Sequence, residues 1–249
     1  MVILKSLQEI EKIRSACLVV VDVLAGIREL VRPGVNTLEL DEFAEKFIIK
    51  ASAKPAFKGY RGYPRTLCTS VNNQVVHGIP SQGVVLKNGD IISVDVGAIR
   101  DGFYGDAAIT LPIGKITSEA KHLIAVTEEA LYQGITEAKV GNRLYDISHA
   151  IQSYAESFGF SVVREFVGHG IGRNLHEDPQ VPNFGKRGQG PRLKPGMVLA
   201  IEPMINAGAR GTMVKDDAWT AVTTDGSLSA HFEHTIALMP EGPMVLTKH

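Results

Sequence analysis

The chain contains a weak internal repeat, and two related halves restrict the folds that it can adopt. Leu86-Lys87-Asn88-Gly89 is followed by an apolar run and Asp95, and Leu193-Lys194-Pro195-Gly196 is followed by an apolar run and Glu202. The matching positions are 107 residues apart, because 193 − 86, 196 − 89 and 202 − 95 all equal 107. Each half would therefore supply a turn, a strand and a carboxylate at the strand end.

The same separation relates two glycines that precede expected helices, Gly34 and Gly141 (141 − 34 = 107). Turns of the Lys-x-Gly type before strands also arise by coincidence, but the constant separation favours duplication. Duplicated halves would place a site on a pseudo-two-fold axis. No linker or change in composition separates them, so we expect one domain over residues 1–249.

Hydrophobic periodicity predicts four helices and a largely antiparallel set of strands. Ser6 and Glu9 form a capping box for a helix that runs to about Gly26. Further helices are expected over 40–47, 118–138 and 144–158, and strands over 66–71, 75–79, 91–99 and 103–111. Asp101-Gly102 predicts a hairpin turn that sets the last two strands side by side.

The composition is that of an ordinary globular protein, with 249 residues, 44% hydrophobic residues, 21% charged residues and a net charge of −1. This balance argues against a nucleic-acid substrate or an anionic membrane partner. Cys17 and Cys68 are the only cysteines, so we expect no disulfide framework and a reducing cytoplasm. The first residues turn polar too soon for a signal peptide, and no stretch is long enough to span a membrane.

Charged side chains occupy apolar strand contexts, where an unpaired charge is costly. Asp95 and Glu202 end apolar runs, Glu233 precedes one, and His169 lies between two glycines. Any one such carboxylate is more often a turn or capping residue than a ligand. Together with Asp106, however, the four carboxylates would repel one another on converging, and cations are the natural compensation. Oxygen-rich sites with one imidazole favour a pair of divalent ions such as Mn, Fe, Co or Zn.

Other readings of the motifs have less support. His77 and His176, taken alone, could be a half-buried strand histidine and an exposed loop histidine. The run from Gly168 to Arg173 is similar to a phosphate-binding glycine loop, but Arg173 replaces the last glycine. The sequence holds no Gly-x-Ser-x-Gly motif, and neither cysteine has a nearby histidine that would support a thiol nucleophile.

Several longer stretches carry a specific resemblance that covers essentially the whole chain. They are Lys58–Pro64, Cys68–Asn72, Val76–Pro80, Asp90–Gly97, Asp101–Asp106, Gly168–Gly172, Ala200–Pro203, Asp216–Thr220 and Phe232–Thr235. In these stretches the chain resembles the type I methionine aminopeptidases in their minimal bacterial form. The resemblance implies an α+β pita-bread fold, with two pseudo-symmetric halves and a curved antiparallel sheet flanked by helices around a dinuclear metal site.

The resemblance also implies a role for each candidate residue. Two divalent ions (Co, Mn, Fe, Zn or similar) would be bridged by Asp106 and Glu233, with Asp95 completing one ion and His169 and Glu202 the other. An activated water would attack the carbonyl after the first residue, with Glu202 as proton shuttle. His176 would contact the substrate carbonyl or the oxyanion, and His77 the scissile amide nitrogen.

The expected methionine pocket combines aromatic and apolar side chains, namely Tyr60, Tyr63, Cys68, Trp219, Phe57 and Leu175. Aromatic walls suit a thioether, although Trp219 could equally be an ordinary core residue. Three positions depart from the family pattern: Phe57 replaces a common cysteine, Leu175 a common aromatic residue, and His231 a common glutamine. None of these removes a metal ligand, but they leave the shape of the pocket open.

We therefore expect a metalloaminopeptidase that removes the initiator methionine from nascent proteins and peptides when the second residue is small. The alternatives are an X-Pro aminopeptidase of the same fold, a non-catalytic pita-bread module that binds proteins, and a metal-stabilised structural domain. The expected enzyme is cytoplasmic and monomeric, acts without a membrane or nucleic-acid partner, and has the ribosome as a candidate contact.

Overall fold

The computed structural model describes residues 2–249, with four long helices and fifteen short and long strands. The helices are α1 (Leu7–Leu30), α2 (Thr37–Lys50), α3 (Ser118–Glu137) and α4 (Leu144–Ser157), with a 3₁₀ turn η1 at Tyr60–Gly62. The strands are β1 (Lys54–Pro55), β2 (Leu67–Val71), β3 (Gln74–Val76), β4 (Ile91–Arg100), β5 (Phe103–Pro112), β6 (Ser161–Val162), β7 (Gly168–Gly170), β8 (Glu177–Val181), β9 (Val198–Ile201), β10 (Met204–Asn206), β11 (Thr212–Val214), β12 (Ala221–Thr223), β13 (Ser229–His231), β14 (Glu233–Met239) and β15 (Gly242–Val245).

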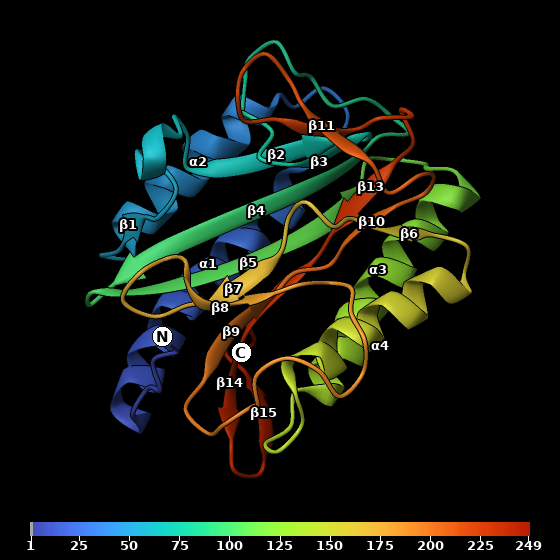
Figure 1. Cartoon of the computed structure of the whole chain (residues 1–249). Coiled ribbons are helices and arrows are strands. Elements are labelled where there is room, and N and C mark those ends of the chain that lie inside the picture. The colour runs from blue at the N-terminus through green and yellow to red at the C-terminus, as the bar shows by residue number, and fades with distance from the viewer. Residues whose placement is uncertain (1) are drawn as a thin grey trace.

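A nine-stranded antiparallel sheet joins the two halves of the chain. Its order is β1-β4-β5-β14-β9-β7-β8, with β2 paired to β4 and β15 to β14 (Figure 1). The predicted β4–β5 hairpin is confirmed, with ten residue pairs from Ile91–Pro112 to Arg100–Phe103. Its turn residues Asp101 and Gly102 both have positive φ angles, 50° and 75°, as a tight hairpin turn requires. The direct β5–β14 pairing brings the halves together.

The four predicted helices are confirmed, with small shifts at their ends. The Ser6 hydroxyl accepts from the Glu9 amide at 3.3 Å and the Glu9 carboxylate accepts from the Ser6 amide at 3.1 Å, which completes the capping box. The first helix ends at Leu30 rather than near Gly26. None of the helices within residues 2–249 is both long and apolar enough to cross a membrane.

The expected strand over 75–79 is wrong beyond Val76, where β3 ends. His77 has a φ angle of 60°, so the chain leaves the extended conformation there. Gly78 then approaches β2, and its carbonyl accepts from the Thr69 amide at 2.8 Å. The alternation of apolar residues did not reveal this turn, because a left-handed residue other than glycine has no pattern in hydrophobicity.

The internal repeat in the sequence corresponds to a repeat in the structure, because equivalent elements and contacts lie 107 residues apart. Helices α2 and α4 start and end 107 residues apart (144 − 37 and 157 − 50), and β4 and β9 start 107 apart (198 − 91). The amide of Gly34 donates to the Leu86 carbonyl at 2.9 Å, and that of Gly141 donates to the Leu193 carbonyl at 3.2 Å. Single bridges at Asn36–Val85 and Arg143–Arg192 follow the same offset (143 − 36 and 192 − 85).

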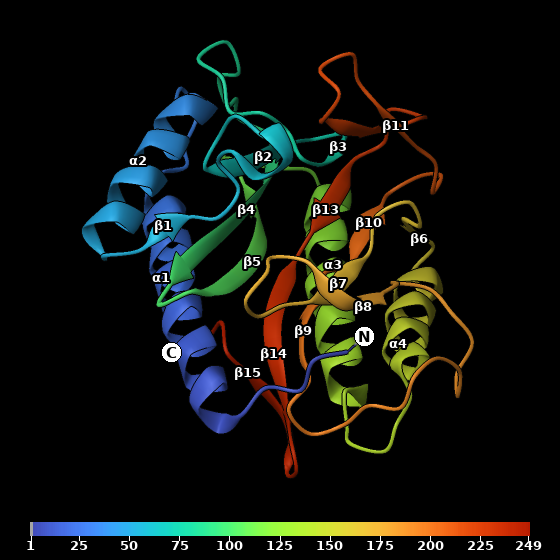
Figure 2. The same ribbon diagram turned by 60° about the vertical axis from the view of Figure 1, so that its left-hand side comes forward.

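The helices pack on one face of the sheet, which leaves the other face for polar side chains. The pair α1 and α2 buries alternate residues of β4, including Val94 and Val96. The pair α3 and α4 buries alternate residues of β9 and β14, including Leu199 and Ile236. Figure 2 shows the two helix pairs at either side, with β14 running between α1 and α3. Because side chains alternate along a strand, the residues between these buried positions point to the opposite face.

Candidate metal centre and active site

All thirteen residues predicted for the site line one cavity of about 180 Å³ on this polar face. The carboxylates and histidines form one part of its wall, and the aromatic and apolar side chains form the rest. They are Asp95, Asp106, His169, Glu202, Glu233, His77, His176, Phe57, Tyr60, Tyr63, Cys68, Leu175 and Trp219, and Arg61 joins them as a fourteenth. The fold therefore gathers residues from positions 57 to 233 around a single space.

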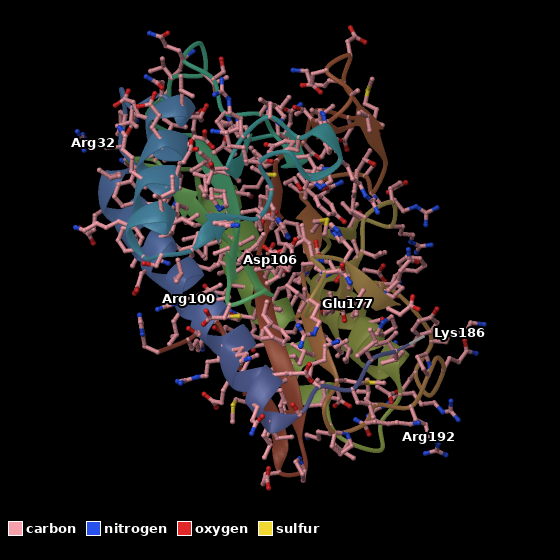
Figure 3. All side chains as sticks on the ribbon, turned by 90° about the vertical axis from the view of Figure 1, so that its left-hand side faces the viewer. Arg32, Arg100, Asp106, Glu177, Lys186 and Arg192 are labelled. Atoms are coloured by element: carbon pink, nitrogen blue, oxygen red, sulfur yellow. The ribbon has the colours of Figure 1, made fainter. Side chains whose placement is uncertain are left out.

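Strand register explains why the carboxylates converge. Ala108 in β5 is paired with Asp95 on one side and with Glu233 on the other. Asp106 lies two residues before Ala108, so it points to the same face of the sheet. Glu202 follows the last residue of β9, and the β9–β14 register brings it next to Glu233. Figure 3 shows Asp106 deep in the middle of the molecule.

His169 is held with one ring nitrogen facing these carboxylates. It lies in β7, paired with Ala200 of β9. Its Nδ1 lies 3.0 Å from the Gly170 carbonyl oxygen, so Nδ1 carries the proton that it donates. Its Nε2 lies 3.5 Å from Glu202 Oε1 and 4.0 Å from Asp106 Oδ2. A lone pair on Nε2 fixed by such a backbone contact is the usual state of a metal-ligating histidine.

The electrostatics of the carboxylates fit a cationic occupant. Burial, followed by repulsion from Glu233 and Asp95, raises the pKa of Asp106 well above its usual range. Burial and the neighbouring carboxylates likewise raise the pKa values of Glu202 and Glu233. One oxygen each of Asp95, Asp106 and Glu233 is buried without a hydrogen-bond partner among the described residues. Unpartnered oxygens aimed at a shared space are the donors that hard divalent cations bind.

The donor atoms also meet the distance requirement for a shared ion. One ligand atom each from Asp106, His169 and Glu233 lies within 4.8 Å of the other two. Asp95 and Glu202 extend this group along the cavity wall. Asp95 and Asp106 thus come from the β4–β5 hairpin, whereas Glu202 directly follows β9 and Glu233 begins β14.

Two further histidines lie at the cavity without belonging to the carboxylate cluster. His77 is half-buried, and burial, with a smaller effect of nearby His176, lowers its pKa to about 4. The His176 ring centre lies 4.4 Å from that of His169, and its Nδ1 lies 2.8 Å from the Tyr60 hydroxyl. Burial and then the charge of Arg61 lower the pKa of His176. Both imidazoles are therefore neutral near pH 7.

Hydrogen bonds and a ring contact hold the aromatic side chains of the cavity in place. The Tyr63 hydroxyl donates to the Leu67 and Gly78 carbonyls at 2.9 and 3.0 Å, and the Tyr63 ring meets Trp219 edge to face at 5.1 Å. Cys68 is buried, lines the cavity and pairs with Asp95 across β2 and β4. Trp219 is half-buried at the cavity, so it is not an ordinary core residue.

Two residues at the site were not assigned a role from the sequence. Arg61 lines the cavity, has a φ angle of 49°, and places its guanidinium 5.4 Å from the Tyr60 ring centre. Its place inside the stretch Lys58–Pro64 was the only available signal. His231 is buried with its Nε2 atom 3.7 Å from Glu202 Oε2, so the departure noted at this position lies beside a carboxylate of the cluster.

The chain belongs to metallopeptidase family M24, whose model matches residues 11–239. Relatives with high sequence identity to this chain are all methionine aminopeptidases. A methionine aminopeptidase of Clostridium perfringens (strain 13 / Type A) is 55% identical over 99% of each chain. Methionine aminopeptidase 1 of Bacillus subtilis (strain 168) is 53% identical over 100% of each chain. The crystal structure of methionine aminopeptidase from Thermotoga maritima superposes over 100% of each chain with a TM-score of 0.99 at 48% identity. The pita-bread fold and a metal-dependent hydrolase are thereby established.

Proposed function

We propose that this chain is a methionine aminopeptidase that hydrolyses the bond after an amino-terminal methionine when the second residue is small. One observation carries the proposal: a carboxylate–imidazole cluster and an aromatic pocket share a single cavity. The relatives that are more than half identical over nearly their whole length have this name. No observation favours an X-Pro aminopeptidase or a non-catalytic binding module, and the latter would be expected to lose part of the cluster.

The five residues of the cluster would hold two divalent ions. Asp106 and Glu233 are central and buried, which suits bridging positions. Asp95 lies on the side of Cys68, whereas His169 and Glu202 lie together on the other side. Bound ions would polarise the scissile carbonyl and lower the pKa of the attacking water.

The chain's own residues would supply the proton transfers and the hydrogen bonds. Glu202 Oε2 lies 3.7 Å from His231 Nε2 and can take a proton from the water and pass it to the leaving amine. The Tyr60 hydroxyl lies 2.8 Å from Nδ1 of His176, and a hydroxyl that donates there would leave the proton of the neutral imidazole on Nε2. There it can be donated to the carbonyl oxygen as negative charge develops. Neutral His77, beside Trp219, can accept from or donate to the scissile amide.

The remaining assignments follow from this function. The substrates would be nascent polypeptides and peptides with amino-terminal methionine, and the ribosome is where such chains emerge. We propose a cytoplasmic monomer with one catalytic domain over residues 1–249. The rings of Tyr63 and Trp219 and the apolar Phe57 and Leu175 would surround the methionine side chain.

A peptide panel tests the proposal. The purified protein, loaded with Co or Mn, should cleave Met-Ala-Ser much faster than Met-Leu-Ser or Leu-Ala-Ser. A single missing or misfitting group in such a pocket changes kcat/KM by about 10- to 200-fold. Comparable rates on all three peptides would refute the proposal, and preferential cleavage of an Ala-Pro peptide would support the X-Pro alternative.

A further inference from the structure

Lys5 is a buried lysine that the proposed chemistry does not use. It lies in the segment before α1, and its backbone amide donates to the Gly196 carbonyl at 2.7 Å. Its ammonium group forms an ion pair with the carboxylate of Glu177, and both side chains are only 4% exposed. A buried ion pair often stabilises a protein no more than apolar residues would, because both charges lose their hydration. A contribution to stability therefore does not by itself explain why Lys5 and Glu177 are paired at this position.

Glu177 directly follows His176 and holds the turn that carries it. While Oε2 receives the Lys5 ammonium, Oε1 accepts from the Asn174 amide at 3.1 Å. The carboxylate thus closes residues 174–177 into one turn. Leu175, in the middle of that turn, is buried and lines the cavity, and His176 presents its ring to the same cavity. Figure 3 shows Glu177 inside the molecule, whereas Lys186 and Arg192 lie at its periphery.

The stem of Lys5 fills a space that a glycine leaves open. A Cβ atom at Gly172 would lie 2.5 Å from Lys5 Cε and 3.0 Å from Glu177 Oε1. The Gly172 carbonyl also accepts from the Tyr104 amide at 2.9 Å, which fixes the base of the turn to β5. Figure 2 shows the amino-terminal segment running from α1 across to the region of β7 and β8. The lysine therefore packs against the turn without lining the cavity.

We propose that Lys5 is a positioning residue for the reaction. Through Glu177 its ammonium group fixes the turn over residues 174–177, and the turn fixes the His176 imidazole at the place where the substrate carbonyl would lie. This inference rests on the role that the proposed function gives to His176. Small displacements of a positioned group are costly, since a misplacement of about 1 Å can lower a rate by about a hundredfold.

The variant Lys5→Met/Glu177→Gln tests the proposal without leaving an unpaired buried charge. Methionine keeps the length of the stem, and the glutamine carbonyl can still accept from the Asn174 amide. We expect kcat on Met-Ala-Ser to fall about ten- to hundredfold, with a smaller change in KM and the metal content of the unmodified protein. Amide hydrogen exchange at residues 174–177 should become faster. Lys46→Met, which removes the lysine of an exposed ion pair on α2, is the control.

Repeating the substitution in a His176→Ala variant distinguishes an effect on the position of His176 from a general effect on the fold. In His176→Ala, the double substitution at Lys5 and Glu177 should change kcat by less than about twofold, because residues that act as one unit are not additive. The same fold-loss in both backgrounds, or an unchanged kcat when His176 is present, would overturn the proposal. A His176→Ala enzyme with normal turnover would overturn the proposed role of His176 as well, whereas a wild-type protein that does not cleave Met-Ala-Ser would refute the proposed function itself.

Discussion

The two halves of the molecule share a plan and differ in what lies between their carboxylates. In the first half, Asp95 and Asp106 lie on one hairpin whose strands are joined by a two-residue turn. In the second half, Glu202 directly follows β9 and Glu233 begins β14, but the chain between them forms the short strands β10 to β13. The repeat offset of 107 holds from Asp95 to Glu202 and grows to 127 from Asp106 to Glu233 (233 − 106).

This difference separates the origin of the four carboxylates from that of other residues at the site. The elements common to both halves place four carboxylates on one face of the sheet, which suits a metal site. The additional residues of the second half bring Trp219 to the pocket and His231 to Glu202. His169 and His176 also come from the second half. Duplication therefore accounts for the four carboxylates, whereas the longer segment between β9 and β14 adds Trp219 and His231, and the first half supplies most of the aromatic pocket.

Both halves should be needed to bind the two metal ions. Asp106→Ala and Glu233→Ala each remove one central carboxylate, from different halves, and both should lose both ions and all measurable activity because each carboxylate is assigned a bridging position. Plasma emission spectrometry on the purified variants counts the metal. Glu42→Ala, at an exposed position of α2, is the control. Two ions retained by either bridging variant would contradict the assignment.

Asp95 and Glu202 occupy equivalent positions of the repeat, yet we assign proton transfer to Glu202 alone. Glu202→Gln should lower kcat by about a hundred- to ten-thousandfold even when fully metallated, because an amide cannot accept the proton. Asp95→Asn should weaken metal binding and regain most of its activity at excess metal. Steady-state kinetics across a metal titration distinguish the two. Near-normal turnover of fully metallated Glu202→Gln would show that another group, with His77 as the candidate, transfers the proton.

His176 belongs to the second half and lies in the turn that leads into β8. His176→Ala should lower kcat by about a hundred- to a thousandfold, the usual loss for one oxyanion donor, and leave the metal content intact. His149→Ala, at a half-buried histidine on α4 whose Nδ1 and Nε2 lie 3.4 and 3.3 Å from the Ser153 hydroxyl, is the matched control. Unchanged turnover, or loss of metal, would refute the role of His176.

The carboxylate face predicts how the metal-free protein responds to pH. Burial raises the pKa of Asp95 to about 7 and those of Asp106, Glu202 and Glu233 further above their usual range. Near and above pH 7 the folded apoprotein then binds more protons than the unfolded chain, so its stability falls as pH rises. The fall is about 1.4 kcal/mol per pH unit for each such proton.

The buried histidines act in the opposite direction but at lower pH. Burial lowers the pKa values of His77, His169, His231 and His234 to about 3 or 4. Their contribution rises with pH up to about 6.5 and is constant above it. Urea denaturation of chelated protein should therefore show a loss of stability from pH 6.5 to 8, which Asp106→Asn should reduce and bound metal should remove. A flat profile for the chelated wild-type protein would be inconsistent with a buried carboxylate cluster.

The smallest effect tests the repeat itself. Gly34 and Gly141 both have a φ angle of 95°, with no atom within 4 Å of an added Cβ. Alanine at either position should cost about 1–2 kcal/mol of stability through backbone strain alone, by equal amounts, without changing kcat. Gly83→Ala, at an ordinary φ angle, should change stability by less than about 0.5 kcal/mol. Unequal losses at Gly34 and Gly141, measured by urea denaturation, would show that the two turns are not equivalent.

Local chemistry explains which parts of the fold could be predicted from the sequence. The capping box at Ser6 and the Asp101-Gly102 turn depend on neighbours in the chain, and both are confirmed. The strand predicted over 75–79 was wrong beyond Val76, because His77 has a left-handed backbone and the Gly78 carbonyl accepts from the Thr69 amide of β2. Likewise, the ion pair of Lys5 with Glu177 joins residues 172 positions apart, and no local pattern indicates such a contact.

The residues of the candidate site could be predicted more completely than the ends of the strands around them. Charges in apolar runs identify Asp95 and Glu202 because their burial must be compensated wherever the strands lie. Arg61 was not assigned, since an exposed arginine in a loop has no such requirement. The individual roles of the thirteen residues remain predictions that the substitutions above test.

The most direct test of the central claim is a metal titration of the chelated protein during cleavage of Met-Ala-Ser. We expect no cleavage without metal, activity that rises with added Mn, Fe, Co or Zn as ions bind, and no comparable cleavage of an Ala-Pro peptide at any point. Cleavage of Met-Ala-Ser by the fully chelated protein, or metal binding that never restores it, would refute a metal-dependent methionine aminopeptidase.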